Sequence, residues 1–473
     1  MEDRFYLERY LAEEAAPYEP MSFGELCTRI EGEFRREWDE ERGDSGRILA
    51  VQKRAIIGYA KEVAYFKDKI SGLIRAYQAE KTRFPAWHAS LADAVYHENW
   101  GLSGMAEWFG ESMGGSSSAK IIGDRIYFLE GGVMRLKPQT ISRDRREQLT
   151  RAFLLLTPDE RLDREFHEIY MLDGTRVTVF RGAMTKPDQD VIIFRRYIIP
   201  SYSFEEQALR GSIPKESIGL FRSMARVGYN VAFCGPVRSA KTTFLSTWQS
   251  CEDASLEGVM VETDPEIPLH KLMPEAPVVQ LIADQDKLKN ISKNLLRSDA
   301  DYFILAEARD GIALDTAVRM ARKGTRRMKI TFHTRDPLFF PYDVAVEIVR
   351  AMGGGLEETA RRVAGSFDYV FHFVQLKRKD QKRLRAIYEL GICPESRETR
   401  MVEICRYLFA EDRWAWTYHI SEDKRLAGEE EDAEAFAEFD AALRRLAEDS
   451  AGQDSAGQDS AGQDDGAKGG GAS

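Results

Sequence analysis

Apolar residues in the first part of the chain recur at three- and four-residue steps, which is the spacing of one face of an α-helix. The clearest run consists of Ile56, Ala60, Val63, Phe66, Ile70, Leu73 and Tyr77. We therefore predict a helical N-terminal extension over residues 1–110, and we expect this stripe to pack into its core.

The pattern changes after "GESMGGSSSAK" (residues 110–120), whose glycines and serines are typical of a loop. Up to residue 199 the chain shows short or alternating apolar runs, as in "RIYFLEGGVMRL", "DREFHEIYMLDGTRVTVFRG" and "DVIIFRRYII". Such runs are typical of strands, and Gly131-Gly132 and Asp173-Gly174 mark turns between them. Residues 111–205 are predicted to form a small α+β domain.

Short apolar strands then alternate with helical stretches between residues 229 and 335. The predicted strands are "YNVAFCG", "GVMVETD", "APVVQLIAD", "YFILAEA" and "RMKITFHT". This alternation predicts a mostly parallel sheet flanked by helices. "DYVFHFVQLKR", "RLRAIYELGI" and "WAWTYHI" are expected to finish that sheet or to form a small meander beside it. Residues 206–420 are thus predicted to be an α/β domain.

The C-terminal part differs from the rest in composition. Residues 421–449 are predicted to form an acidic amphipathic helix, with Phe436, Phe439, Leu443 and Leu446 on one side. Residues 450–473 repeat the unit "SAGQD" and contain too few apolar residues to pack, so we expect them to be disordered.

Composition limits the class of protein. At 473 residues the chain is long enough for two or three folded units, and 43% hydrophobic content is typical of a globular protein. No apolar run approaches the roughly eighteen residues of a membrane span, and the charged N-terminus does not resemble a signal peptide, so we expect a cytoplasmic protein. The five cysteines are scattered without a CxxC pair, which supports neither a disulfide framework nor a thiolate zinc site.

The charge balance is acidic. A formal charge of −11 opposes non-specific attraction to nucleic acid, and no specific nucleic acid is expected as a partner. The basic run "ARKGTRRMK" (residues 321–329) is interpreted as a solvated turn and strand edge, with a positive surface patch as the alternative.

The segment "FCGPVRSAKTTF" (residues 233–244) has the features of a phosphate-binding loop. Such a loop needs a strand, a turn whose backbone N–H groups point at the phosphates, and a helix whose N-terminus faces the same charge. Here "YNVAFC" supplies the strand and "KTTFLSTWQS" the helix. The predicted phosphate-binding residues are Gly235, Pro236, Val237, Arg238, Ser239, Ala240, Lys241, Thr242 and Thr243.

Within this loop, Lys241 is expected to reach the β- and γ-phosphates, and the Thr242 hydroxyl is expected to coordinate Mg²⁺. Ala240 stands where such loops carry their last glycine. If its backbone is left-handed, the added Cβ costs about 1 kcal/mol and weakens binding. The alternative interpretation is an ordinary strand, turn and helix that binds nothing.

Three further strands end in polar residues. "DYFILAEARDG" ends in Glu307, "VMVETDPEIPL" in Glu262, Asp264 and Glu266, and "KITFHTRDP" in His333. In a parallel sheet such ends share one edge, where open α/β folds bind ligands. An acidic residue there can hold a metal's water shell or orient an attacking water. Taken singly, each is more simply a surface glutamate or a structural histidine.

The series "GPVRSAKTT", "VETDPEIPL", "ILAEARDG" and "TFHTRDP" resembles the Walker A, Asp-box, Walker B and His-box motifs of the secretion and pilus-assembly ATPases, which serve type II secretion, type IV and tight-adherence pili, and type IV secretion. The resemblance covers roughly residues 120–395 and includes "DGTRVTV" and "VIIFRRY" in the preceding domain. It implies a RecA-like P-loop NTPase core joined to a smaller N-terminal domain. It also implies ATP and Mg²⁺ bound between the two domains, and a homohexameric ring.

The resemblance also assigns roles to residues. Glu262 and Glu266 match the Asp-box acids, with Glu262 the general-base candidate. Glu307 matches the Walker B glutamate at the metal, and His333 matches the residue that senses the γ-phosphate. Arg176 and Arg195 match two arginines of the family that approach the phosphates from the N-terminal domain. An equal alternative is that both are solvated strand residues without a role at the site. Three positions depart from the family pattern in ways that slow turnover: Thr263, Ala240 and Ala306.

The sequence thus predicts an ATP-hydrolysing motor that powers pilus assembly or protein secretion. Its expected partners are copies of itself and a polytopic inner-membrane platform protein, which would place it at the inner face of the cell membrane. Two alternatives stay open: a RecA-like nucleic-acid motor, and an ATP-binding regulatory or scaffold protein with weak hydrolysis.

Overall fold

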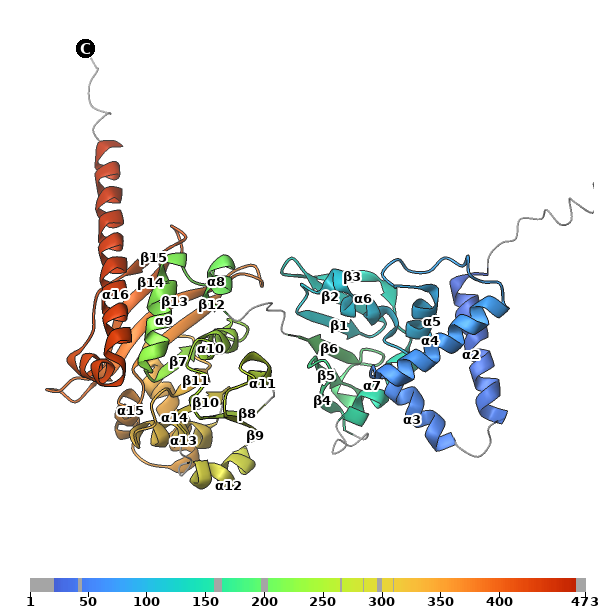
Figure 1. Cartoon of the computed structure of the whole chain (residues 1–473), viewed down its shortest axis with the longest axis horizontal. Helices are drawn as coiled ribbons and strands as arrows, with labels where there is room; N and C mark the ends of the chain where they lie inside the picture. Colours follow the sequence, from blue (N-terminus) through green and yellow to red (C-terminus); the bar gives the residue numbers. More distant parts are fainter. Residues whose placement is uncertain are drawn as a thin grey trace, which may run out of the picture. The chain divides into compact units, whose positions relative to one another are not determined.

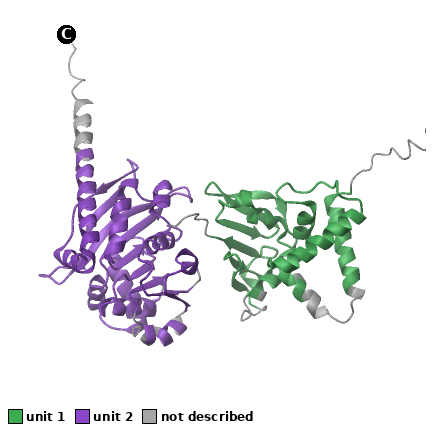
Figure 2. Cartoon of the chain, viewed as in Figure 1, with its two compact units in different colours: residues 1–198 green, residues 199–473 purple. Residues whose placement is uncertain are grey.

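The structure is a computed structural model that describes residues 21–40, 45–156, 164–196, 203–263, 266–283, 285–295, 300–308 and 310–464. The chain divides into two compact units, residues 1–198 and residues 199–473, coloured green and purple in Figure 2. Each unit has its own buried apolar core. No helix within these ranges is long and apolar enough to cross a lipid bilayer.

Unit 1 begins with helices. They are α2 (Phe23–Glu40), α3 (Ser45–Ile56), α4 (Ala60–Ala76), α5 (Leu91–Asn99) and α6 (Ala106–Phe109), followed after the first strands by α7 (Arg143–Phe153). The predicted stripe from Ile56 to Tyr77 is divided between α3 and α4, because Gly58 between them has φ +91°. A left-handed glycine ends a helix at no steric cost. The buried residues of α4 are Phe66, Ile70 and Ile74, so Ile74 replaces Leu73 of the predicted stripe.

An antiparallel sheet follows in unit 1, with strand order β3-β2-β1-β6-β5-β4. Its strands are β1 (Ser118–Ile122), β2 (Arg125–Glu130), β3 (Val133–Thr140), β4 (Phe166–Tyr170), β5 (Arg176–Phe180) and β6 (Val191–Arg195). One face buries alternate residues such as Ile121, Phe128 and Phe194, which is the period of two that a half-buried strand requires. The predicted turns at Gly131-Gly132 and Asp173-Gly174 join β2 to β3 and β4 to β5.

Unit 2 is built on a nine-stranded sheet of order β15-β14-β13-β12-β7-β11-β10-β8-β9. The strands are β7 (Val231–Cys234), β8 (Gly258–Glu262), β9 (Val278–Ile282), β10 (Tyr302–Ala306), β11 (Lys329–Phe332), β12 (Tyr369–Gln375), β13 (Lys382–Ile392), β14 (Thr399–Leu408) and β15 (Arg413–Trp416). The strands from β12 to β9 are parallel, whereas β13, β14 and β15 add an antiparallel meander. The α/β architecture expected for this part of the chain is confirmed.

Helices cover both faces of this sheet (Figure 1). They are α8 (Phe204–Leu209), α9 (Ile218–Val227), α10 (Lys241–Gln249), α11 (Leu269–Leu272), α12 (Gln285–Leu295), α13 (Gly311–Arg322), α14 (Phe340–Met352), α15 (Leu356–Ala364) and α16 (Glu422–Asp464). Helices α9, α10 and α16 share one apolar core with the sheet, and α13, α14 and α15 share the other. Strand β14 was not predicted, because the charged residues Arg400, Glu403 and Arg406 interrupt its apolar pattern.

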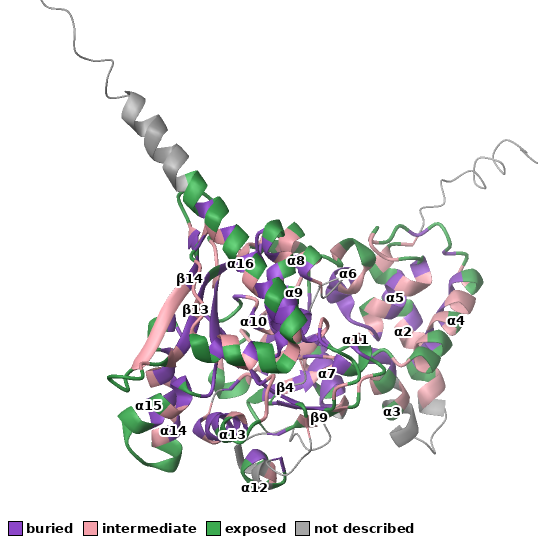
Figure 3. Cartoon of the chain, turned by 60° about the vertical axis from the view of Figure 1, so that its left-hand side comes forward, coloured by how far each residue is buried: buried purple, intermediate pink, exposed green. Residues whose placement is uncertain are grey.

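The C-terminal helix α16 packs along unit 2. It buries Phe436, Phe439 and Leu443, so buried and exposed positions alternate along it (Figure 3). The helix runs through Asp464, whereas we expected disorder from residue 450; residues 465–473 lie outside the described residues. Its acidic N-terminal half meets the basic run 321–329: Arg326 lies 3.5 Å from Glu430 and Arg327 lies 3.3 Å from Glu431.

Candidate functional site

The predicted phosphate loop leaves the carboxyl end of β7, a fully buried strand with β11 and β12 on either side. Gly235 opens the loop with φ +140°, and a Cβ at this position would lie 2.2 Å from the carbonyl oxygen of Phe373. Only glycine fits there. The loop therefore lies pressed against β12, at the edge of the sheet where α/β folds bind ligands.

The backbone of the loop alternates in handedness. Arg238 has φ +64° and Ala240 has φ +76°, one on each side of the buried Ser239. Successive N–H groups in such a backbone form a concave anion-binding nest. Within the described part of the chain, the backbone N–H groups of residues 237–240 donate no hydrogen bond, and the Ser239 hydroxyl has no partner either. The loop thus presents unpaired donors at the N-terminus of α10, which is the chemistry of a phosphate site.

Lys241 is the first residue of α10 and lies among the predicted catalytic side chains. Its ammonium donates to the Pro236 carbonyl (2.9 Å) and lies 3.3 Å from Nδ1 of His333. Nε2 of His333 lies 3.9 Å from a carboxylate oxygen of Glu307. Lys241, His333 and Glu307 therefore form one continuous group, although they come from three different segments of the chain.

Glu307 follows directly after β10 in a left-handed conformation with φ +56°. Its N–H donates to the Thr331 hydroxyl of β11 at 2.8 Å, which holds this turn in place. Ala306, at the position of the family glycine, is the buried last residue of β10. The left-handed residue at this strand end is thus the glutamate itself.

Glu262 is the buried last residue of β8 and lies beside Ala306 in the parallel ladder. One of its carboxylate oxygens accepts the N–H groups of Glu266 (3.1 Å) and Ile267 (2.9 Å). The carboxylate therefore also shapes the loop after β8. Thr263 is exposed, and Asp264 lies outside the described residues.

The predicted metal ligands stay predictions. Thr242 and Thr243 lie half-buried in the first turn of α10, next to the loop donors. A threonine hydroxyl and a carboxylate such as Glu307 are hard oxygen donors, which Mg²⁺ prefers. The residues present thus fit a magnesium ion held by Thr242 and Glu307.

Arg176 and Arg195 belong to unit 1, on the adjacent strands β5 and β6. They face each other in register, and Arg176 forms an ion pair with Glu168 of β4. Their approach to the phosphates stays a prediction.

One basic residue near the loop was not identified from the sequence. Lys382 begins β13 and donates to the Gln375 amide oxygen at 2.6 Å. Burial lowers the pKa of Lys382 to about 8, and the nearby Arg238 guanidinium makes a smaller contribution in the same direction. No motif marks this lysine, because only the pairing of β12 with β13 brings it beside the loop.

A second polar cluster lies in unit 1. The Asp93 carboxylate lies 2.5 Å from the Lys67 ammonium and 3.2 Å from Nδ1 of His88. His97 lies 3.7 Å from the same carboxylate, and its Nδ1 accepts the N–H of Leu102. The proton of neutral His97 is therefore on Nε2, the atom that faces Asp93, which leaves that nitrogen unsuited to a metal. We therefore interpret this cluster as the Asp93 carboxylate with its basic partners Lys67 and His88, and not as a metal site.

No protein-family model and no curated protein matches the chain. Among solved structures, it is similar to the ATPase DotB of Yersinia pseudotuberculosis, with 13% identity and a TM-score of 0.45 over 78% of this chain and 89% of that one. The pilus retraction motor PilT with bound ADP has 13% identity and a TM-score of 0.43 over 68% and 85% of the two chains. The VirB11 ATPase of the Brucella suis type IV secretion system has 14% identity and a TM-score of 0.33 over 60% and 92%. Likenesses this distant do not by themselves assign an activity.

Proposed function

We propose that this chain is an ATP-hydrolysing motor of the secretion and pilus-assembly type. The observation that supports this most is the loop at residues 235–242. There, unpaired backbone donors, the Lys241 ammonium and the His333–Glu307 pair face the same edge of the sheet. Anion donors next to a carboxylate are what phosphoryl transfer to water requires.

The geometry supports a division of labour among the side chains. The loop N–H groups and Lys241 stabilise charge on the transferring phosphoryl group, while Thr242 and Glu307 are the proposed ligands of Mg²⁺. Glu262 is the proposed general base that orients the attacking water. His333 lies between Lys241 and Glu307, so it is positioned to respond when Lys241 leaves the Pro236 carbonyl for a phosphate.

As a motor, the chain would couple nucleotide binding and product release to movement of its two units, a step that often limits such cycles. We propose a homohexamer that works at a polytopic inner-membrane platform protein, at the inner face of the membrane. Arg176 and Arg195 of unit 1 are further proposed phosphate-binding residues.

The test uses the full chain with ATP and Mg²⁺. Lys241→Ala should weaken ATP binding about 10- to 100-fold, since it removes a charged hydrogen-bond donor. Glu262→Gln should keep ATP binding and abolish phosphate release, because it removes the proposed general base. Lys323→Ala, an exposed lysine at the end of α13, is the matched control. If the wild-type chain takes up no ATP at millimolar concentration, the proposal is wrong.

Two observations bear on the alternatives. Arg326 and Arg327 of the basic run are paired with acids of α16, which disfavours a nucleic-acid surface there. Two residues with a Cβ occupy left-handed positions in the loop, which favours an ATP-binding protein with slow turnover as the second candidate.

A further inference from the structure

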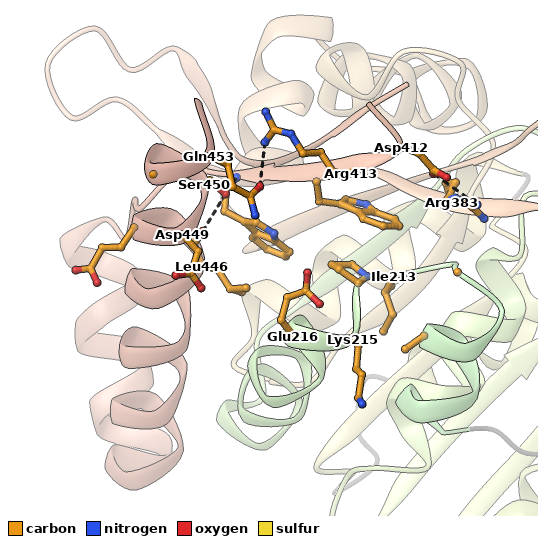
Figure 4. A pocket seen from close by; sticks show the side chains of 17 residues that line it. Ile213, Lys215, Glu216, Arg383, Asp412, Arg413, Leu446, Asp449, Ser450 and Gln453 are labelled. Atoms are coloured by element: carbon orange, nitrogen blue, oxygen red, sulfur yellow. Dashed lines mark hydrogen bonds and ion pairs between the residues drawn. The ribbon is translucent and has the colours of Figure 1, made fainter. Parts of the chain in front are cut away.

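Unit 2 contains a cavity of about 930 Å³ whose lining includes no residue of the phosphate site. Its walls come from the segment between α8 and α9, from the β14–β15 hairpin with β15, and from the distal part of α16. Figure 4 shows Leu446 and Ser450 of α16 on one side of the cavity, and Arg383 and Asp412 at one end. A cavity of this size accommodates several side chains of a partner.

The walls of this cavity are held in place by hydrogen bonds. The Leu384 N–H of β13 donates to the Ser212 carbonyl (2.7 Å), and the Leu384 carbonyl accepts the indole N–H of Trp414 (2.7 Å). On the side of α16, the Ser450 hydroxyl accepts the backbone N–H of Trp416 (2.9 Å). A surface that is fixed before binding loses less conformational entropy when a partner binds. The cavity is therefore suited to recognition.

The basic residues that line the cavity leave little positive charge for a ligand to meet. Within the described part of the chain they are Arg383, Arg413 and Lys215. Arg383 lies 3.8 Å from Asp412, and Arg413 forms an ion pair with Glu411 of the same hairpin. Lys215 is directed away from the cavity in Figure 4. The lining thus gives no support for an anionic ligand.

The acidic residues of the lining are mostly unpaired. Glu216 is directed into the cavity (Figure 4), and the exposed Glu448 and Asp449 lie at its rim on α16. Among the residues that the structure describes, none of these three forms an ion pair. The imbalance continues along α16, because residues 446–464 contain five acids and no lysine or arginine. Such a surface attracts and orients a positively charged partner.

The apolar part of the lining is largely aromatic. Trp414 is half-buried and Trp416 is buried, both on β15, and Ile213 and Leu446 add aliphatic surface. An indole is the aromatic group on which a cation stacks best, and a planar guanidinium also pairs with carboxylates. An arginine side chain therefore uses both features of the cavity, whereas a purely apolar ligand would leave the Glu216 carboxylate without a partner.

We propose that this cavity is the docking site of a basic segment of a partner protein, with an arginine side chain placed against Trp414 and Glu216. The inference goes beyond the proposed function and does not rest on it, because the cavity and the phosphate site share no residue. The acidic stretch of α16 extends past the cavity, which favours a chain with several basic groups over a single small cation. Helix α16 thereby acquires a role in partner recognition.

The test measures binding of short labelled peptides to the full chain by fluorescence anisotropy. The probe is a six-residue peptide of alternating arginine and leucine, and its control carries glutamine in place of each arginine. The control should bind at least about 10-fold more weakly, because it lacks the charged donors. Equal binding of the two peptides, or no binding of the arginine peptide at millimolar concentration, overturns the proposal. Displacement of the peptide by spermidine at equal positive charge would assign the cavity to small cations and overturn it as well.

Two variants locate the binding, each with a matched control. Glu216→Gln should weaken the arginine peptide about 3- to 10-fold, whereas Glu358→Gln removes an exposed acid of α15 that does not line the cavity and should have little effect. Trp414→Ala should weaken it about 3- to 30-fold, whereas Phe409→Ala removes a 57% exposed ring of the same hairpin that does not line the cavity. If each variant weakens binding no more than its control, the peptide follows overall charge and the proposal is wrong.

A further measurement needs no variant and covers the case in which Trp414→Ala does not fold. The arginine peptide should slow hydrogen–deuterium exchange in residues 408–416 and 446–453 of the wild-type chain, and the glutamine peptide should not. Slower exchange only in other segments overturns the assignment. ATP is absent throughout, so these results are independent of the proposed ATPase activity.

Discussion

At the scale of single residues, the phosphate loop is unusual in its backbone. Arg238 and Ala240 both adopt left-handed conformations that glycine adopts without cost. For a residue with a Cβ the cost is about 1–2 kcal/mol, and it persists only where the surroundings enforce it. The loop therefore holds strain at the two positions that shape its N–H groups.

Replacing Ala240 by glycine should remove this cost. We expect Ala240→Gly to tighten ATP binding about fivefold, which corresponds to about 1 kcal/mol, and to raise the rate of phosphate release. Phosphate release at saturating ATP and a binding titration are the measurements. Unchanged affinity and rate would mean that the alanine is tolerated.

Arg238→Gly separates backbone strain from charge. It relieves the same kind of strain as Ala240→Gly and also removes a guanidinium beside Lys382. If that charge assists phosphate binding, Arg238→Gly should weaken ATP binding relative to Ala240→Gly. Equal gains from the two variants would show that the charge is not used.

His97 in unit 1 gives a prediction for acid stability. Burial lowers the pKa of His97 to about 4, whereas an unfolded chain has a value near 6.5. A group with a lowered folded pKa contributes its full stability above pH 6.5 and loses it as the pH falls toward 4. The free energy of unfolding in urea should therefore fall between pH 7 and pH 5, and His97→Asn should flatten that dependence. A variant with the wild-type slope would contradict this assignment.

At the scale of elements, α16 is two helical segments joined at Asp432. Its φ of −152° and ψ of 90° interrupt the helix, and its carboxylate accepts the N–H of Ala435 at 2.8 Å. This is the geometry of an N-cap. Because Asp432 also lies 3.4 Å from Arg226 of α9, one residue both starts the distal segment and attaches it to the core.

Loss of this cap should loosen α16. We expect Asp432→Ala to lower the free energy of unfolding by about 1–2 kcal/mol, measured by chemical denaturation. Glu434→Ala is the control, since this carboxylate is 83% exposed and lies 3.9 Å from the same arginine. If Glu434→Ala lowers the free energy of unfolding by as much as Asp432→Ala does, the effect comes from surface charge and not from the helix cap.

At the scale of the whole molecule, the proposed ring depends on nucleotide. With ATP and Mg²⁺, the wild-type chain should elute from a sizing column at a larger size than it does alone, and chelation of Mg²⁺ should reverse this. Lys241→Ala should show no shift. An elution position that is independent of nucleotide and metal would contradict a nucleotide-driven ring.

Local patterns were enough to predict much of this protein. The alternation of strands and helices, the phosphate loop and the polar strand ends at Glu262, Glu307 and His333 are short-range features, so the α/β fold and the set of candidate residues followed from them. Strand β14 was missed because charged residues interrupt its apolar pattern, and the break at Gly58 was missed because a single glycine hardly changes the helical spacing around it.

Only the tertiary structure decided how these parts meet. Parallel pairing of β11, β10 and β8 brings His333, Glu307 and Glu262 to one edge, and the pairing of β12 with β13 brings Lys382 beside the loop. The handedness of Arg238 and the packing of α16 over a cavity likewise depend on contacts between residues far apart in the chain. Periodicity and turn residues report local backbone preference, whereas such contacts are set by which apolar faces are buried together.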